Sequence, residues 1–249
     1  MILTEVGHED KLEGLARRIA ACRLCPRLVR HREAAAAAPP RRYCGERYWA
    51  KPLPGFGDPW ARVLLVGLAP AAHGGNRTGR MFTGDRSGDW LFHALHEAGF
   101  ASQPTSVRRD DGLRLHDAYI TATVRCAPPA NRPTPAERER CRPYLLEELR
   151  LLRRLRVVVA LGRIAWDGYL RARRAMGAPV PRPVPRFGHG AMAPMPDGII
   201  LIGSFHPSQQ NTFTGRLTRG MLRAVFVKAR RLAGGRAPRS EQPAQRRHR

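Results

Sequence analysis

The stretch VLLVGLAPAAHGGNRTGRMFTGD at positions 63–85 decides the fold, because an apolar run in it leads directly into a glycine-rich loop. Residues 63–68 include no polar side chain, and such a run is typical of a strand covered on both faces in a parallel sheet. Three other runs have a similar apolar character, at 119–124, 157–161 and 199–202. Helical patterns lie between and around them, at 9–21, 87–98, 135–154, 163–175 and 215–232. Strands that alternate with helices predict a layered α/β domain.

Local signals sharpen some of these boundaries. The third helical pattern has the clearest start, because Thr134 can cap it, Pro135 occupies its first position and Glu137 completes a capping box. The low-complexity connector AAAAAPPRR at 34–42 could begin as the end of a helix, and the helix would stop at the two prolines. The segment 177–196 is rich in Pro and Gly and predicts a long surface loop or a β-hairpin.

The charge balance indicates the kind of partner. The chain has 249 residues, with 44 Lys and Arg against 20 Asp and Glu, for a formal net charge of +24. This excess favours a polyanion, and nucleic acid is the first candidate. The last segment, 234–249, supplies only +4 of the charge and is poor in apolar residues. We therefore expect a single basic domain at 1–233, followed by a disordered basic tail.

The sequence argues against several classes of protein. Its longest apolar stretch, 63–72, is half the length of about 20 residues that a membrane-spanning helix needs. The start MILTEVGHEDK lacks the basic and long apolar regions of a signal peptide, so we expect a cytoplasmic chain with no membrane partner. Five cysteines are an odd number in a chain without an export signal, which favours metal binding or catalysis over a disulfide framework.

Four of the cysteines could share one site. Cys22 and Cys25 form a CxxC pair at the end of the first helix. Cys126 follows the second strand, and Cys141 lies in the capped helix. Four thiolates could close a zinc site or hold an iron–sulfur cluster, and the pattern does not separate the two metals. The alternative is that Cys126 and Cys141 are ordinary buried cysteines and the CxxC pair acts alone. Cys44 is left over, and we expect it to be a small buried hydrophobe.

A polar or glycine-rich loop follows each predicted strand. Ligands of open parallel sheets bind outside the carboxyl ends of the strands, so four loops should converge on one site. Phe82, among polar groups in the first loop, suits stacking on a planar ring, with core packing as the alternative. His206, at the end of the fourth strand, is a candidate for chemistry or a structural histidine. Donors near the last helix could bind a phosphate, namely Thr214, Arg216 and Thr218.

Three segments resemble one known family. GLAPAAHGGNRTGRMFTGD at 67–85 and HPSQQNTFTGRLT at 206–218 are similar to the two signature motifs of the family 5 uracil-DNA glycosylases. CAPPANRPTP at 126–135 is similar to a further segment of that family, and the resemblance runs from about position 22 to 230. It implies the superfamily fold, a three-layer α/β/α domain with a central four-stranded parallel sheet. It also implies a [4Fe–4S] cluster, with zinc as the less favoured occupant, on Cys22, Cys25, Cys126 and Cys141.

The resemblance further implies an activity. It predicts a monofunctional hydrolase that removes uracil and other deaminated bases, such as hypoxanthine, from double-stranded DNA and leaves an abasic site for base excision repair. We expect it to act as a monomer without an organic cofactor. Many superfamily members place Asp, Asn or Glu just after the first strand to position water, whereas this loop is GLAPA. That work would pass to Asp85, helped by Asn131. The segment TATV before Cys126 lacks the Asn that some relatives use to recognise uracil, in keeping with a broad substrate range.

Roles follow for individual residues by the same resemblance. The catalytic residues would be Asp85, Asn131 and His206. The flipped base would be bound by Gly67, Ala69, Phe82 and His206. The DNA contacts would come from Asn76, Arg77, Ser208, Gln209, Gln210, Asn211 and Arg216.

Two other functions share part of this pattern. A non-catalytic nucleic-acid-binding module with a four-cysteine metal site would have the same charge and the same cysteines. It would not account for the glycine-rich loop, His206 and the convergence of loops at the strand ends. An electron-transfer protein with an iron–sulfur cluster is disfavoured by the large basic surface and by the lack of a second cofactor motif in the sequence.

Overall fold

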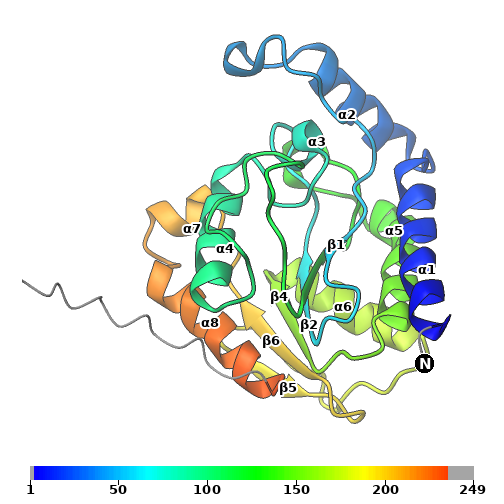
Figure 1. Cartoon of the computed structure of the whole chain (residues 1–249), viewed down its shortest axis with the longest axis vertical. Coiled ribbons are helices and arrows are strands. Elements are labelled where there is room, and N and C mark those ends of the chain that lie inside the picture. Colours follow the sequence, from blue (N-terminus) through cyan, green and yellow to red (C-terminus); the bar gives the residue numbers. More distant parts are fainter. Residues whose placement is uncertain (1–2, 235–249) are drawn as a thin grey trace, which may run out of the picture.

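A mixed sheet forms the centre of the molecule in the computed structural model, which describes residues 3–234. The strand order is β1-β3-β2-β4-β6-β5 (Figure 1). Its four inner strands are parallel: β3 (Ala118–Ala122), β2 (Val63–Gly67), β4 (Val157–Leu161) and β6 (Ile200–Ser204). Short antiparallel strands close the two edges: β1 (Phe56–Gly57) and β5 (Met192–Pro194). The predicted α/β fold is confirmed, and the described sheet has two edge strands beyond the four expected.

Helices cover both faces of this sheet, as Figure 1 shows. One face packs on α4 (Arg86–Glu97) and α8 (Arg219–Leu232), through a core that includes Phe92 and Phe226. The other face packs on α6 (Arg163–Ala175), whose Trp166 is fully buried there. Outside α6 lie α5 (Pro135–Leu151) and α1 (Leu3–Ala20), which contact each other. The three layers place every strand residue of β2, β3 and β4 in the buried interior.

Several helix boundaries differ from the prediction. α1 begins at Leu3 rather than near position 9, and a second helix, α2 (Pro26–Ala37), was not predicted except as a helix end before Pro39. The CxxC pair therefore lies between two helices. α8 starts at Arg219, where Thr218 accepts a hydrogen bond from Met221 N at 3.2 Å. The residues ahead of it form the short helix α7 (Gln209–Phe213).

Other local predictions agree with the structure. The capping box of α5 is present, since Glu137 N donates to Thr134 Oγ1 at 3.2 Å and Thr134 N donates to Glu137 Oε2 at 2.7 Å. Most of the segment 177–196 is loop, and its end forms the edge strand β5. Among residues 3–234, no helix has the length and apolar character needed to cross a membrane. The predicted tail lies outside the described residues from position 235 onward.

Candidate active site

A cavity of about 400 Å³ lies where the loops leave the carboxyl ends of the strands. Its volume is within the range of known small-ligand pockets, about 300–1,000 Å³. The cavity is lined by His31, Arg42, Tyr43, Ala71, Ala72, His73, Gly74, Asp85, Arg86, Pro128, Ala130, Asn131 and Gln209. The loops after β2, β3 and β6 all contribute to this lining. The predicted convergence of strand-end loops is therefore confirmed for three of the four.

Asp85 forms one wall of the cavity and also begins α4. Its Oδ1 accepts a hydrogen bond from Gly88 N at 2.9 Å, so the carboxylate is the N-cap of that helix. A Cβ at position 74 would overlap Asp85 Oδ2, so only glycine leaves room for the carboxylate there. Burial raises the pKa of Asp85, against the opposing effect of the backbone hydrogen bonds. The side chain is thus held in a fixed position where its charge is poorly solvated.

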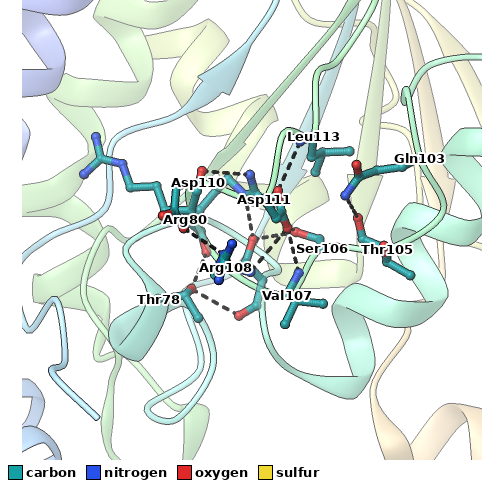
Figure 2. A network of polar contacts seen from close by, with 12 residues as sticks. Thr78, Arg80, Gln103, Thr105, Ser106, Val107, Arg108, Asp110, Asp111 and Leu113 are labelled. Atoms are coloured by element: carbon teal, nitrogen blue, oxygen red, sulfur yellow. Dashed lines mark hydrogen bonds and ion pairs between the residues drawn. The ribbon is translucent and has the colours of Figure 1, made fainter.

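A polar network around Arg80 and Asp111 fixes the loop between β2 and α4 (Figure 2). The buried Arg80 guanidinium donates to both carboxylate oxygens of Asp111, at 2.8 and 2.9 Å, and to Ser106 Oγ at 2.8 Å. Asp111 in turn accepts from Val107 N at 2.8 Å. Burial alone would raise the pKa of Asp111, but the hydrogen bonds from Arg80 and from backbone amides lower it overall. The network joins the loop after β2 to the segment between α4 and β3.

The rings of Phe82 and His206 pack against each other, and neither residue lines the cavity. Their centroids are 5.8 Å apart, and a Cβ at Gly67 would lie 3.0 Å from the Phe82 ring. Phe82 has a positive φ of 53° and belongs to the main apolar core, so the core-packing alternative describes much of its surface. Burial lowers the pKa of His206 to about 4, and the imidazole is therefore neutral near pH 7. Asn211 Nδ2 donates to the His206 carbonyl at 2.8 Å and fixes this turn.

Asn131 lines the cavity from the loop after β3. It is exposed and ends a 3₁₀ turn (Pro129–Asn131), in which both Ala130 and Asn131 have positive φ, at 51° and 54°. Asn adopts this left-handed conformation readily, whereas for Ala it costs on the order of 1–3 kcal/mol. Backbone strain of this kind collects at functional sites. Asp85 and Asn131, from loops about 45 positions apart in the sequence, therefore meet at one cavity as predicted.

Two predicted DNA-binding residues support the loop from inside the protein. Asn76 is fully buried, and its Nδ2 donates to the carbonyls of Arg32 and Ala72 at 3.1 and 3.3 Å. Arg77 donates to the carbonyls of His73 and Gly84 and forms an ion pair with Glu46. Neither side chain is thus placed as a free surface donor, which corrects the expectation for Asn76 in particular.

The remaining predicted residues divide between the cavity and its surroundings. Gln209 lines the cavity. Ser208 and Gln210 lie with it at the start of α7, and Arg216 is exposed with its guanidinium 4.5 Å from the Phe205 ring centroid. Ala69, predicted to bind the base, packs against the buried cysteines instead.

Five side chains of the cavity wall that carry polar groups were not predicted, namely His31, Arg42, Tyr43, His73 and Arg86. Tyr48 Oη and His73 Nδ1 are 3.0 Å apart and share a hydrogen bond. Burial, followed by the charges of Arg42 and Arg77, lowers the pKa of His73. The first three residues come from α2 and the turn after it, where the sequence indicated only a connector. His73 was visible within the glycine-rich loop, but its type and spacing carry no specific signal.

The four cysteines predicted as ligands line a second, small pocket beside the cavity. Cys25, Cys126 and Cys141 are buried in an apolar cluster, whereas Cys22 is half-buried. Cys44 is exposed, so the prediction of a buried hydrophobe was wrong: it follows the 3₁₀ turn Arg41–Tyr43 at the surface.

The chemistry of this pocket fits a soft metal centre. Arg32 Nη1 donates to Cys126 Sγ at 3.1 Å, and Arg125 N donates to Cys141 Sγ at 3.3 Å. Arg32 is only 2% exposed, and its buried Nε has no hydrogen-bond partner within residues 3–234. A buried guanidinium needs a nearby anion, and metal-bound thiolates would supply one. In the same part of the chain no three His, Cys, Asp or Glu side chains form a group that could hold a metal ion.

Comparisons with known proteins agree with this geometry. Residues 54–230 match the model of the uracil DNA glycosylase superfamily. The chain is 54% identical to a type-5 uracil-DNA glycosylase of Mycobacterium bovis over 217 residues, which are 87% of this chain and 80% of the relative. It is 53% identical to the Thermus thermophilus protein of the same name over 222 residues, which are 89% of this chain and 98% of the relative. At 46% identity over 222 residues, it also matches a type-5 uracil-DNA glycosylase of Pyrobaculum aerophilum across 89% of this chain and 93% of that one. The chain therefore belongs to the uracil DNA glycosylase superfamily, and within it to the type-5 family.

Proposed function

We propose that this protein hydrolyses the N-glycosidic bond of uracil and other deaminated bases, such as hypoxanthine, in double-stranded DNA. The product would be an abasic site for base excision repair. One observation carries the proposal: Asp85 and Asn131 line a single cavity of base-compatible size at the strand ends. Such a cavity accommodates a nucleotide turned out of the duplex, which is the form in which glycosylases act on a base.

Base recognition would rest on shape and stacking. A flipped base would lie against Phe82, whose ring packs closely against Gly67. Because β3 ends in Ala122 with Thr123 and Val124 following, no amide side chain stands there to select uracil by its edge. This composition supports a broad range of deaminated bases rather than uracil alone.

Bond cleavage would be assisted by charge placed on each side of the breaking bond. Departure of the base leaves positive charge on the sugar and negative charge on the base. The neutral His206 imidazole would donate a hydrogen bond to the base oxygen as that charge develops. Asp85, helped by Asn131, would orient water and stabilise the cationic sugar. Asp85 suits this role because its carboxylate is held rigidly by Gly88 N in a partly dehydrated site.

The cofactor would be a [4Fe–4S] cluster held by Cys22, Cys25, Cys126 and Cys141. When bound it would supply a structural cross-link, because the reaction transfers no electrons. The four cysteines come from the α1–α2 connection, the loop after β3 and α5, so they would tie these three segments together. We further propose that the enzyme acts as a monomer in the cytoplasm without an organic cofactor.

The decisive experiment is a product assay. Purified protein would be incubated with duplexes that contain uracil, hypoxanthine or a normal base, and alkali-labile abasic sites would be counted. We expect abasic sites at the uracil and hypoxanthine positions only, and they should form about 10²-fold more slowly with the Asp85→Asn variant prepared in parallel. DNA binding without abasic product from either damaged base would instead support a non-catalytic nucleic-acid-binding module.

A further inference from the structure

Two neighbouring residues of α2 face two different sites. His31 lines the candidate catalytic cavity. Arg32 is buried, and its Nη1 donates to Cys126 Sγ at 3.1 Å. Nη1 and Nη2 each also donate to the Cys22 carbonyl at 3.4 Å. This one side chain thus contacts two of the segments that carry the proposed cluster ligands.

The main chain of the same residue contacts the glycine-rich loop. Asn76 Nδ2 donates to the Arg32 carbonyl at 3.1 Å, and Asn76 is fully buried in α3 (Gly75–Thr78). Its own carbonyl accepts from Ala50 N at 3.0 Å. The loop that includes Gly74, under the Asp85 carboxylate, is therefore anchored to α2 through Arg32.

Both ends of this connection hold a buried polar atom without a partner. Arg32 Nε and Asn76 Oδ1 make no hydrogen bond to any residue between 3 and 234. Each such atom costs on the order of 1–3 kcal/mol, so this arrangement is not what stability alone would select. A guanidinium placed there gains its compensation from negative charge at the cysteines.

From these contacts we propose that Arg32 is a positioning residue that couples the cysteine site to the catalytic cavity. Its guanidinium donates to Cys126 Sγ in the cysteine site. Its carbonyl accepts from Asn76 and thereby holds the loop beneath Asp85. Negative charge on the cysteine sulfurs fixes the guanidinium, which fixes this turn of α2. The cluster thereby sets the geometry of the cavity, in addition to joining three segments of the chain. The inference rests on the proposed function only in treating this cavity as the catalytic one.

Amide hydrogen exchange on the purified, coloured protein tests the coupling without relying on activity. The amides of Asn76, Arg77 and Thr78 are hydrogen-bonded within the loop, so their exchange rates report on its opening. We expect Arg32→Met to accelerate exchange in segment 74–79 by about tenfold, roughly the loss of one hydrogen bond, with exchange in α8 unchanged. Arg30→Met is the matched control, because Arg30 is exposed on the same helix and the charge lost is the same. It should leave both segments at wild-type rates.

Asn76→Ala and the double variant complete the test. Asn76→Ala should open the loop to a similar extent and leave the visible absorbance of the metal centre unchanged. If both residues act through one connection, the double variant should exchange no faster than the faster single variant. Wild-type loop exchange in Arg32→Met, or additive effects in the double variant, would overturn the coupling. Because the readout is exchange, this result is separable from failure of the glycosylase assay.

Discussion

At the scale of single residues, Asp85 combines a capping role with an unfavourable charge. Burial raises its carboxyl pKa, so the native state binds this proton more readily than the unfolded chain does. The resulting cost is absent below the ordinary pKa of 3.8, grows as pH rises from 3.8 to the raised value, and is constant above that value. At neutral pH the ionised side chain therefore lowers the stability of the native state. We infer from this cost that the charge of Asp85 has a functional role.

Asp85→Asn should separate these two effects. Asn is as good an N-cap as Asp, so α4 keeps its first hydrogen bond. We expect single-turnover cleavage of a uracil duplex to fall by about 10²-fold, the size of a lost acid–base contribution. The free energy of unfolding in urea at pH 7 should be equal to or above that of the wild type. Asp10→Asn, on the exposed face of α1, removes the same charge and should change neither quantity. A joint loss of activity and stability would mean that Asp85 is chiefly a folding residue.

His206 gives a prediction about pH. Since burial holds its pKa at about 4, it is neutral throughout the range from pH 6 to 8 and acts as a fixed donor. His206→Ala should lower the cleavage rate by about 10²-fold, as for a lost oxyanion donor, by the same factor at pH 6 and pH 8. The measurement is the single-turnover rate across that interval. A rate ratio that changes with a midpoint near 6.5 would show that the protonated form participates.

Residue type was predictable at this site, whereas side-chain direction was not. Asp85, Asn131 and Gln209 were expected at the site and do line the cavity. Asn76 and Arg77 are also polar and were expected to contact DNA. Asn76 is instead buried against α2, and Arg77 donates to backbone carbonyls. Those partners come from distant segments, so a motif alone gives no information about them.

At the scale of elements, a buried ion pair joins β3 and its following loop to α5. Arg125 Nη1 and Nη2 donate to Glu148 at 3.0 and 2.5 Å, and both side chains are 1% exposed. Thr121 Oγ1 donates to the same carboxylate at 2.5 Å. Arg125 precedes Cys126, and Glu148 lies two turns beyond Cys141 on α5. The pair thereby holds the two elements that carry half of the cysteine ligands.

Breaking this pair should be costly. Glu148→Gln leaves the Arg125 charge buried without a counter-ion, and we expect a loss of about 3–5 kcal/mol in the free energy of unfolding. The control is Glu13→Gln, whose pair with Arg17 has both side chains 68% exposed and should contribute less than about 0.5 kcal/mol. Urea unfolding of both variants at pH 7 gives the comparison. Equal effects of the two substitutions would contradict the role assigned to the pair.

The strands that the sequence predicted are the four inner ones of the sheet, and α6 was predicted with its exact bounds. β4 was located to the residue and β2 to within one, because continuous apolar runs have few other solutions in a folded chain. α2 was missed because one of its three buried positions is Arg32, which a count of apolar residues treats as exposed. β1 and β5 have two and three residues, too few for any periodicity to develop.

At the scale of the whole molecule, charge and topology act together. Because the inner strands are parallel, the loops at their carboxyl ends meet on one side of the sheet. This topology alone predicts where the cavity lies. The net charge of +24 gives attraction to DNA from every direction, but only basic residues near the cavity can hold the phosphates beside a flipped nucleotide. Position, rather than the total, should therefore decide how much each arginine contributes.

Two arginines allow this to be tested with variants of equal net charge. Arg42 lines the cavity, whereas Arg174 is exposed in the last turn of α6. α6 begins just after the carboxyl end of β4 and runs back toward the amino ends of the parallel strands, away from the cavity. Each of Arg42→Gln and Arg174→Gln lowers the net charge by one. Binding to a duplex with an abasic-site analogue would be measured from 50 to 200 mM salt. Loss of one phosphate contact should reduce the slope of log K against log salt by about 1 in Arg42→Gln alone. Equal slopes of log K against log salt for the two variants would mean that the positive charge acts as a diffuse field. In that case the cavity wall formed by α2 and the turn after it would make no phosphate contact with the DNA.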